Sequence, residues 1–304
     1  MHSIHLHDTT YQIPSRWDEL SADQLRRIAW LSTLKKDSSS LSKLFFFVLT
    51  SSLPLWKRLR LQYFYLIQAS TDERGDFLEL VESFQQFRAF TKQIQEKIWC
   101  KTVLLYGPAS GLANCTFFEY IQAEQYFLNY LQADSKRQVI KDIHLGKESA
   151  RSDGKADEWL DRLVATLYRQ KRRGYDPAQD DDPRIPLNAV GTRYRLRYVR
   201  RLDRYRKIGV LMWFDGCRQH LIKRFPLIFQ QAKTQQVGKW NAQAKKQGSA
   251  AEGWLSLISE LSGGMNNYDA IGNTNLYTAL TDVSFRIKKN QEAERARSKV
   301  SRKK

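Results

Sequence analysis

The stretch from Thr192 to Phe229 reads TRYRLRYVRRLDRYRKIGVLMWFDGCRQHLIKRFPLIF and decides what kind of fold this chain can adopt. At about 100° per residue, its tyrosines and basic side chains fall on opposite helical faces. Its second half is apolar, which indicates burial. The stretch therefore predicts one helix, with an aromatic side in a core and a basic side facing anions or water. The inward set is Tyr194, Tyr198, Leu202 and Tyr205, and the outward set is Arg193, Arg197, Arg200, Arg204 and Lys207.

The composition is that of a folded protein with localised positive charge. The 304 residues are 42% apolar and 12% aromatic, which is enough to build a core. The net charge of +18 is concentrated in residues 192–208, 232–250 and 286–304, and the rest of the chain is neutral. Such patches can meet nucleic acid, an acidic protein surface or anionic lipid.

The cysteines and the apolar runs indicate a cytoplasmic protein that does not enter a membrane. The three cysteines are widely spaced and form neither a disulfide framework nor a zinc pattern. Residues 1–20 lack the apolar core of a signal peptide. The longest apolar run, Leu44–Leu55, is far shorter than the ~20 residues that span a bilayer.

The hydrophobic patterns predict a mainly α fold. Residues 3–14 alternate between apolar and polar side chains, which favours a short β-hairpin or one strand that pairs elsewhere. Helices are expected after the Ser21–Gln24 capping box, over 41–50 and 55–68 on either side of Pro54, over 76–99, after the Thr116–Glu119 capping box, and over 157–173. Loops are expected over 104–114, 149–155 and 175–190.

Composition shifts divide the chain into four parts. We expect a helical domain over 1–229, a linker over 230–252, a small helical unit over 253–288 and a disordered basic tail over 289–304. The small unit has little core of its own, so we expect it to pack on the larger domain or on a partner. The apolar face available for that contact is Trp254, Leu257, Ile258 and Leu261.

No catalytic signature is present, and the chain is predicted not to be an enzyme and to bind no cofactor. G-x-S-x-G and H-E-x-x-H are both absent. Cys217 and His220 are one helical turn apart, the spacing of an activated nucleophile, but their apolar neighbours favour burial. The histidines His2, His5 and His7 lack further ligands, so an exposed strand is favoured over a metal site. The aspartates of 175–190 lack calcium-loop spacing, which favours solvation or pairing with arginine.

The alternation of arginine and tyrosine in 193–206 is the main functional signal. Arginine pairs bidentately with carboxylate or phosphate, and tyrosine stacks on nucleic-acid bases. Because the two residue types are predicted on opposite faces, an acidic protein partner is favoured. Nucleic-acid binding by the helix 193–207 and the basic tail is the alternative, and an internal or solvated role is the third interpretation.

Several segments together resemble helical proteins from the tail modules of phages and phage-derived particles. They are IPSRWDELSADQLRRIA near the start, CTFFEYIQAEQYFLNYL and EWLDRLVATLYRQ in the middle, and GWLSLISELSGG with LYTALTDV near the end. The closing unit is similar to tail assembly chaperones, which coat the tape-measure protein before the tail tube polymerises. The resemblance implies protein–protein contacts with a tape-measure or other tail protein in the bacterial host cytoplasm, and it assigns no role to an individual residue.

Overall fold

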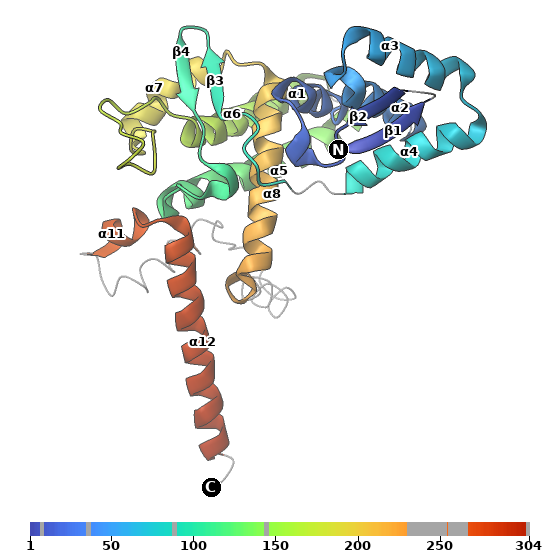
Figure 1. The fold of residues 1–304 in the computed structure, drawn as a ribbon. Helices are drawn as coiled ribbons and strands as arrows, with labels where there is room; N and C mark the ends of the chain where they lie inside the picture. Colours follow the sequence, from blue (N-terminus) through green and yellow to red (C-terminus); the bar gives the residue numbers. More distant parts are fainter. Residues whose placement is uncertain are drawn as a thin grey trace. The chain divides into compact units, whose positions relative to one another are not determined.

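The computed structural model describes residues 1–6, 9–34, 38–86, 90–142, 146–229, 254 and 267–301 (Figure 1). Within these ranges the chain is mainly α-helical and has an antiparallel hairpin at its N-terminus, as predicted. It divides into two compact units. Unit 1 is Met1–Glu96 with Arg201–Cys217, and unit 2 is Lys97–Arg200 with Arg218–Lys304. Both units therefore contain residues of the predicted domain 1–229.

Unit 1 begins with the hairpin and continues as helices. Its elements are β1 (His2–Leu6), β2 (Thr9–Ile13), η1 (Trp17–Glu19), α1 (Ala22–Leu31), α2 (Ser38–Leu49), η2 (Thr50–Ser52), α3 (Leu55–Tyr63), the π-helical turn η3 (Phe64–Gln68), α4 (Thr71–Gln86) and the first part of α8 (Arg204–Arg224). The register pairs His2 with Ile13 and Leu6 with Thr9. Ser21 and Gln24 cap α1 reciprocally, and Pro54 separates α2 from α3, as expected.

The core of unit 1 closes where α8 meets the segment before β3. A Cβ on Gly216 would lie 2.3 Å from the carbonyl oxygen of Phe90, so the helix and this segment are in backbone contact. Trp213 is buried, and its indole nitrogen donates to the carbonyl of Thr91 at 3.0 Å. The apolar second half of the Thr192–Phe229 stretch is thus buried, as predicted.

The predicted helix 76–99 is wrong beyond its first half. Helix α4 ends at Gln86, and β3 (Lys97–Cys100) pairs with β4 (Val103–Tyr106). Ile98 and Cys100 are buried while their neighbours are exposed, which is the two-residue period of a strand. Part of the predicted loop 104–114 is consequently strand, and η4 (Ser110–Leu112) follows it.

Unit 2 is built around two long helices that pack against each other. After β3, β4 and η4 come α5 (Phe117–Asp142), α6 (Gly146–Leu167), α7 (Ala189–Val199), the end of α8, α11 (Tyr268–Gly272) and α12 (Leu276–Ser301). Helix α6 runs through the predicted loop 149–155 and ends before the predicted limit of 173. Its continuation is extended, because Arg169 forms a bridge with Tyr106 and Lys171 with Arg184.

Residues 289–301 are helical where disorder was predicted. Helix α12 continues to Ser301, well into the predicted tail 289–304. Its first turns are buried through Leu276, Leu280 and Val283, and the Tyr277 hydroxyl donates to the carbonyl of Gly111 at 2.7 Å. Because this anchored start already fixes the first turns, adding further turns carries no nucleation cost.

Of the four apolar residues predicted as the contact face of the small unit, the structure describes Trp254. The Trp254 ring lies 5.7 Å from Phe117, 5.8 Å from Tyr120 and 5.7 Å from Phe229, measured between centroids. Leu257, Ile258, Leu261 and the predicted linker 230–252 lie outside the described residues. None of the helices in the described ranges is long and apolar enough to cross a membrane.

Candidate functional site

The predicted basic helix is two helices. Helix α7 ends at Val199, residues 200–203 form a turn, and α8 begins at Arg204. Asp203, the acid that directly precedes α8, lies 3.7 Å from Arg26 in an ion pair. An acidic residue before a helix N-terminus is a common start signal, and it could have revealed the break.

The break separates the predicted anion-binding residues. Arg193 and Arg197 lie on α7 and Arg200 follows its last turn, and all three are exposed. Arg204 and Lys207 belong to unit 1, where Arg204 is half-buried and Lys207 is buried. The candidate surface therefore reduces to Arg193, Arg197 and Arg200.

The predicted separation of tyrosine from arginine is wrong on α7. Tyr194 is 58% exposed, and the Arg197 guanidinium lies 5.3 Å from the centroid of its ring. Val190 is exposed one turn earlier on the same side. The outer face of α7 thus combines an aromatic ring with positive charge, which we call the α7 face (Val190, Arg193, Tyr194, Arg197 and Arg200).

Arg195 points inward from α7, as do Thr192 and Val199. Its Nε donates to the carbonyl of Ala165 at 2.9 Å, and its Nη2 donates to Thr192 Oγ1 at 2.8 Å. Burial, together with the nearby positive charge of Arg169, lowers the pKa of Arg195 to about 10. The side that anchors α7 to unit 2 therefore includes a cation, which the hydrophobic pattern alone did not indicate.

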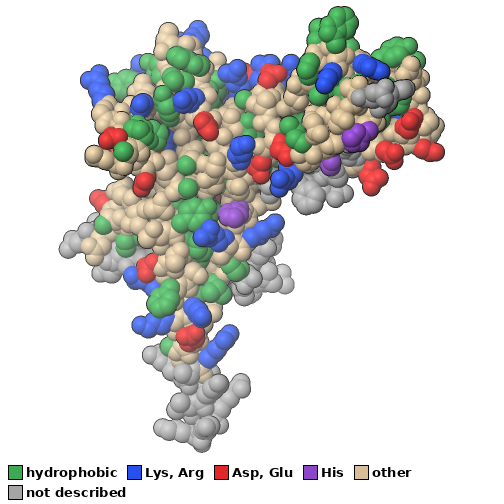
Figure 2. Space-filling model, viewed as in Figure 1, with side chains coloured by type: hydrophobic (Ala, Val, Ile, Leu, Met, Phe, Trp, Pro, Cys, Tyr) green, Lys and Arg blue, Asp and Glu red, His purple; other side chains and the backbone are tan. Residues whose placement is uncertain are grey.

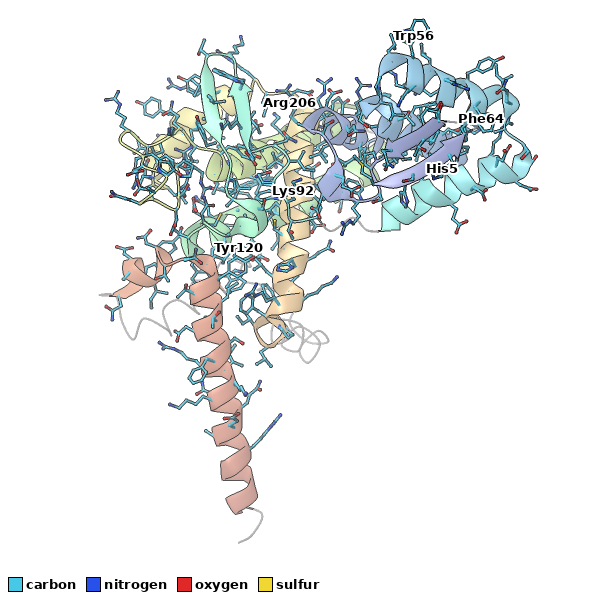
Figure 3. All side chains as sticks on the ribbon, viewed as in Figure 1. His5, Trp56, Phe64, Lys92, Tyr120 and Arg206 are labelled. Carbon is cyan, nitrogen blue, oxygen red and sulfur yellow. The ribbon has the colours of Figure 1, made fainter. Side chains whose placement is uncertain are left out.

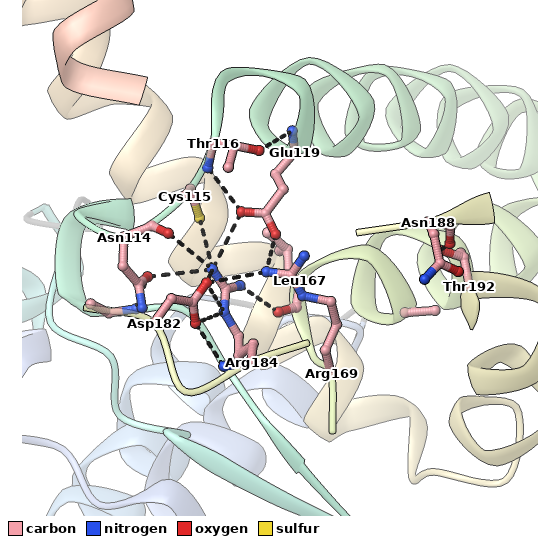
Figure 4. Close-up of polar contacts among 12 residues, drawn as sticks. Asn114, Cys115, Thr116, Glu119, Leu167, Arg169, Asp182, Arg184, Asn188 and Thr192 are labelled. Carbon is pink, nitrogen blue, oxygen red and sulfur yellow. Dashed lines mark hydrogen bonds and ion pairs between the residues drawn. The ribbon is translucent and has the colours of Figure 1, made fainter. Parts of the chain in front are cut away.

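Unit 2 also contains a buried ionic cluster that the sequence analysis missed. Glu119 of α5 forms ion pairs with Arg169 and Arg184, and all three side chains are at most 3% exposed (Figure 4). Asp182 accepts from Arg184 Nε at 2.8 Å, and the carbonyl of Leu167 accepts from Arg184 Nη1 at 2.9 Å. The cluster joins α5, the end of α6 and the loop before α7.

Glu119 has two functions, because it caps α5 and also pairs with the buried arginines, and the sequence pattern indicated only the first. Its Oε2 accepts from the backbone N–H of Thr116 at 2.9 Å, as the Thr116–Glu119 pattern predicted. The same oxygen is 3.3 Å from Arg184 Nη2. The interpretation that the aspartates of 175–190 pair with arginine is confirmed by Asp182 and by the ion pair of Asp180 with Arg172.

The surroundings of the cluster shift the pKa values of Arg184 and Cys115. Burial by itself lowers the pKa of Arg184, but Cys115, Glu119 and Asp182 raise it above its ordinary value. Burial and the nearby carboxylate of Glu119 raise the pKa of the Cys115 thiol to about 12. This thiol is protonated at neutral pH and is therefore a poor nucleophile.

A cavity of about 820 Å³ adjoins the cluster, and its wall contains both positively charged arginines and negatively charged aspartates. The arginines in its wall, Arg169, Arg172 and Arg184, each form an ion pair with a carboxylate. An incoming anion would have to displace these carboxylates. The cluster is therefore best understood as a clasp that holds the loop before α7 in place.

The structure also places the other candidate residues of the sequence. Cys217 is fully buried with its thiol 3.9 Å from the carbonyl of Thr91, whereas His220 is exposed. His5 contacts Thr10 across the hairpin at 3.1 Å, and His7 lies outside the described residues. Among the residues with described positions, no three His, Cys, Asp or Glu are grouped so as to hold a metal ion.

No protein-family model, curated protein or solved structure matches this chain.

Proposed function

We propose that this chain is a non-enzymatic interaction protein that assists assembly of a phage tail or phage-like particle by binding an acidic protein partner in the cytoplasm. The observation that carries the proposal is the α7 face. Three exposed arginines stand on or directly after a helix that contains no acidic residue. Within the described ranges none of the three forms an ion pair, so their guanidinium groups are available for carboxylates of a partner.

The anchoring of α7 supports this function. Arg195 ties the inner side of α7 to α6 through the carbonyl of Ala165, and the clasp holds the loop that precedes α7. A rigid helix presents its side chains at low entropic cost, so a larger share of the contact energy appears as affinity. The α7 face is thus suited to recognition, because the helix that carries its arginines is anchored to α6.

The test is recovery of a partner at moderate salt from cells that co-express the structural proteins encoded beside this chain. Charge reversal of Arg193, Arg197 and Arg200 to Glu is expected to abolish recovery. The matched control reverses Lys43, Lys155 and Arg173, which are exposed elsewhere. Equal recovery by both variants, or no structural protein recovered by the unmodified chain, contradicts the proposal.

Nucleic-acid binding is the second candidate, and one observation favours it. Tyr194 and Arg197 lie side by side and exposed, which is the arrangement that stacks on bases and pairs with phosphate. Gel shifts with duplex and single-stranded DNA over a salt series test this function. Binding should weaken steeply with salt and should weaken again in Tyr194→Ala. No shift at low salt eliminates it.

A further inference from the structure

Helix α3 and the turn after it expose an apolar surface that the proposed function does not use. Six large apolar side chains are each at least 47% exposed, and Trp56 is 82% exposed. Figure 2 shows apolar side chains gathered over this helix, and Figure 3 shows Trp56 directed away from the body of unit 1. We call this set the α3 face: Leu55, Trp56, Leu59, Tyr63, Leu66 and Ile67.

The fold does not need these side chains, because the opposite side of the helix supplies the core contacts. Leu61 is fully buried, and Tyr65 packs on Phe46 and Phe77 with ring centroids 4.7 and 5.5 Å away. Arg74 holds the following turn by donating to the carbonyls of Tyr65 and Leu66 at 3.1 and 2.9 Å. Contiguous exposed apolar surface of this kind marks interaction sites in soluble proteins.

The spacing on the α3 face is that of a helix-packing seam. Within α3, Trp56, Leu59 and Tyr63 recur at intervals of three and four residues, which are the a and d positions of a heptad, and Leu66 follows in the π-helical turn. A second helix fits such a seam by inserting its own side chains between these four. A helix that lies on a membrane instead presents a charged side opposite its apolar side, and here the opposite side carries the buried apolar residues Leu61 and Tyr65.

The charges around the seam indicate the sign of the partner. Lys57 and Arg60 are exposed, Arg58 is half-buried, and no acidic residue occurs between Ser38 and Thr71. Arg60 occupies an e position, from which a side chain forms an ion pair with the facing helix and so affects which partner binds. Two copies of this face would oppose like charges, which disfavours a second copy of the chain.

We infer that the α3 face is a docking site for an acidic amphipathic helix of a partner protein. Trp56 and Tyr63 are the anchors, since aromatic side chains dominate the energetics of protein interfaces. Arg60, which borders the seam at the e position, selects for an acidic flank, and Lys57 adds positive charge at the b position of the same turn. The inference rests on the proposed function as a protein-binding chain, and it adds a second surface that belongs to unit 1 and not to unit 2.

The test uses the full chain and a labelled synthetic helical peptide with Leu at a and d and Glu at e and g. Fluorescence anisotropy should report binding, and a peptide with Lys in place of Glu should not bind. Trp56→Ser should weaken binding by about thirtyfold, since the loss of one aromatic hot-spot side chain costs about that much. The matched control is Trp99→Ser, because Trp99 is 62% exposed on β3.

Reversal of the selecting charges provides a second readout that does not depend on the anchor. The double variant Lys57→Glu, Arg60→Glu should prefer the Lys peptide over the Glu peptide. Circular dichroism confirms that each variant is folded. Absence of binding by the Glu peptide, or an unchanged preference in the double variant, overturns the inference.

Two further measurements separate other occupants of the face. Co-sedimentation with phosphatidylserine vesicles that is lost in Trp56→Ser, without peptide binding, assigns the face to lipid. Sedimentation velocity that shows a dimer lost in Trp56→Ser assigns it to a second copy. Either result overturns the inference but leaves the proposed function standing, because partner recovery through Arg193, Arg197 and Arg200 is measured separately.

Discussion

Arg184 and Glu119 are 65 residues apart in the sequence, and their side chains meet at 3.3 Å with at most 1% exposed. The pair ties the loop before α7 to the first turn of α5. Because both groups are removed from water, the loss of either one leaves the buried charges of the cluster unbalanced, even though Glu119 also pairs with Arg169 and Arg184 with Asp182. The clasp is therefore a polar contact on which the stability of this unit depends.

Replacement of Glu119 by Gln should strongly destabilise the chain. The free energy of unfolding should fall by about 3–5 kcal/mol, because the two buried guanidinium groups of Arg169 and Arg184 would keep only the part-exposed carboxylate of Asp182 as an ion-pair partner. Denaturant unfolding measures the change. The control is Glu158→Gln, which removes the exposed pair with Arg162 and should cost less than about 0.5 kcal/mol. Similar losses in the two variants would show that the cluster is not the clasp described above.

The thiol of Cys115 should make stability depend on alkaline pH. Its pKa is raised from 9.0 to about 12 in the folded chain, so the folded state keeps a proton that the unfolded state releases. The contribution is complete below pH 9 and is lost as the pH rises toward 12. The unfolding free energy of the natural chain should therefore fall relative to that of Cys115→Ala across this window. Parallel pH profiles for the two proteins would contradict the assignment.

The close approach of α8 to Phe90 predicts opposite effects at two glycines. Gly216→Ala should destabilise by about 1–3 kcal/mol, because the added methyl group meets backbone atoms that cannot rotate away. Gly154→Ala in α6 has nothing within 4 Å of the new methyl group and should stabilise by about 0.5–1 kcal/mol. Thermal unfolding distinguishes them, and a harmless Gly216→Ala would rule out the backbone contact.

The two orientations of arginine on α7 should separate stability from binding. Arg195→Ala should lower the unfolding free energy by about 1–3 kcal/mol, since it removes two buried hydrogen bonds. Arg193→Ala should change it by less than about 0.5 kcal/mol, because this side chain is exposed. Partner recovery should fall more in Arg193→Ala than in Arg195→Ala, provided that both variants are folded. If Arg195→Ala were as stable as Arg193→Ala, the inward position of Arg195 would be wrong.

The features that local sequence determines were predicted well. The N-terminal hairpin, the capping boxes at Ser21 and Thr116 and the division at Pro54 each depend on residues close together in the chain. Their physical causes, side-chain alternation, capping hydrogen bonds and a missing N–H, act over a few residues. Sequence patterns report such causes directly.

The second hairpin was missed because its turn lacks the usual residues. Lys101 sits between β3 and β4 with φ of 55°, a left-handed conformation that Asn or Gly normally adopts. Without that signal, the apolar residues up to Ile98 continued the helical spacing that begins at Phe77. The pattern therefore favoured one helix where the chain forms a helix and a strand.

The candidate site was predicted in composition but not in geometry. The exposed positions of Arg193, Arg197 and Arg200 agree with the predicted outward face. The inward position of Arg195 and the outward position of Tyr194 do not follow hydrophobicity. Arg195 can be buried because its hydrogen bonds to Ala165 and Thr192 compensate the loss of water around its charge. The clasp depends on residues from three separate segments, and a single sequence does not report which distant residues meet.

The inserted connectivity of unit 1 has a consequence for synthesis on the ribosome. Phe90 and Thr91 emerge early from the ribosome. The residues of α8 that contact them, Gly216 and Trp213, are synthesised more than a hundred residues later. Translation must therefore complete the first segment of unit 2 while this surface is still uncovered. Nascent chains halted before α8 should expose it to chaperones, and no contiguous fragment that omits residues 97–200 can reproduce native unit 1.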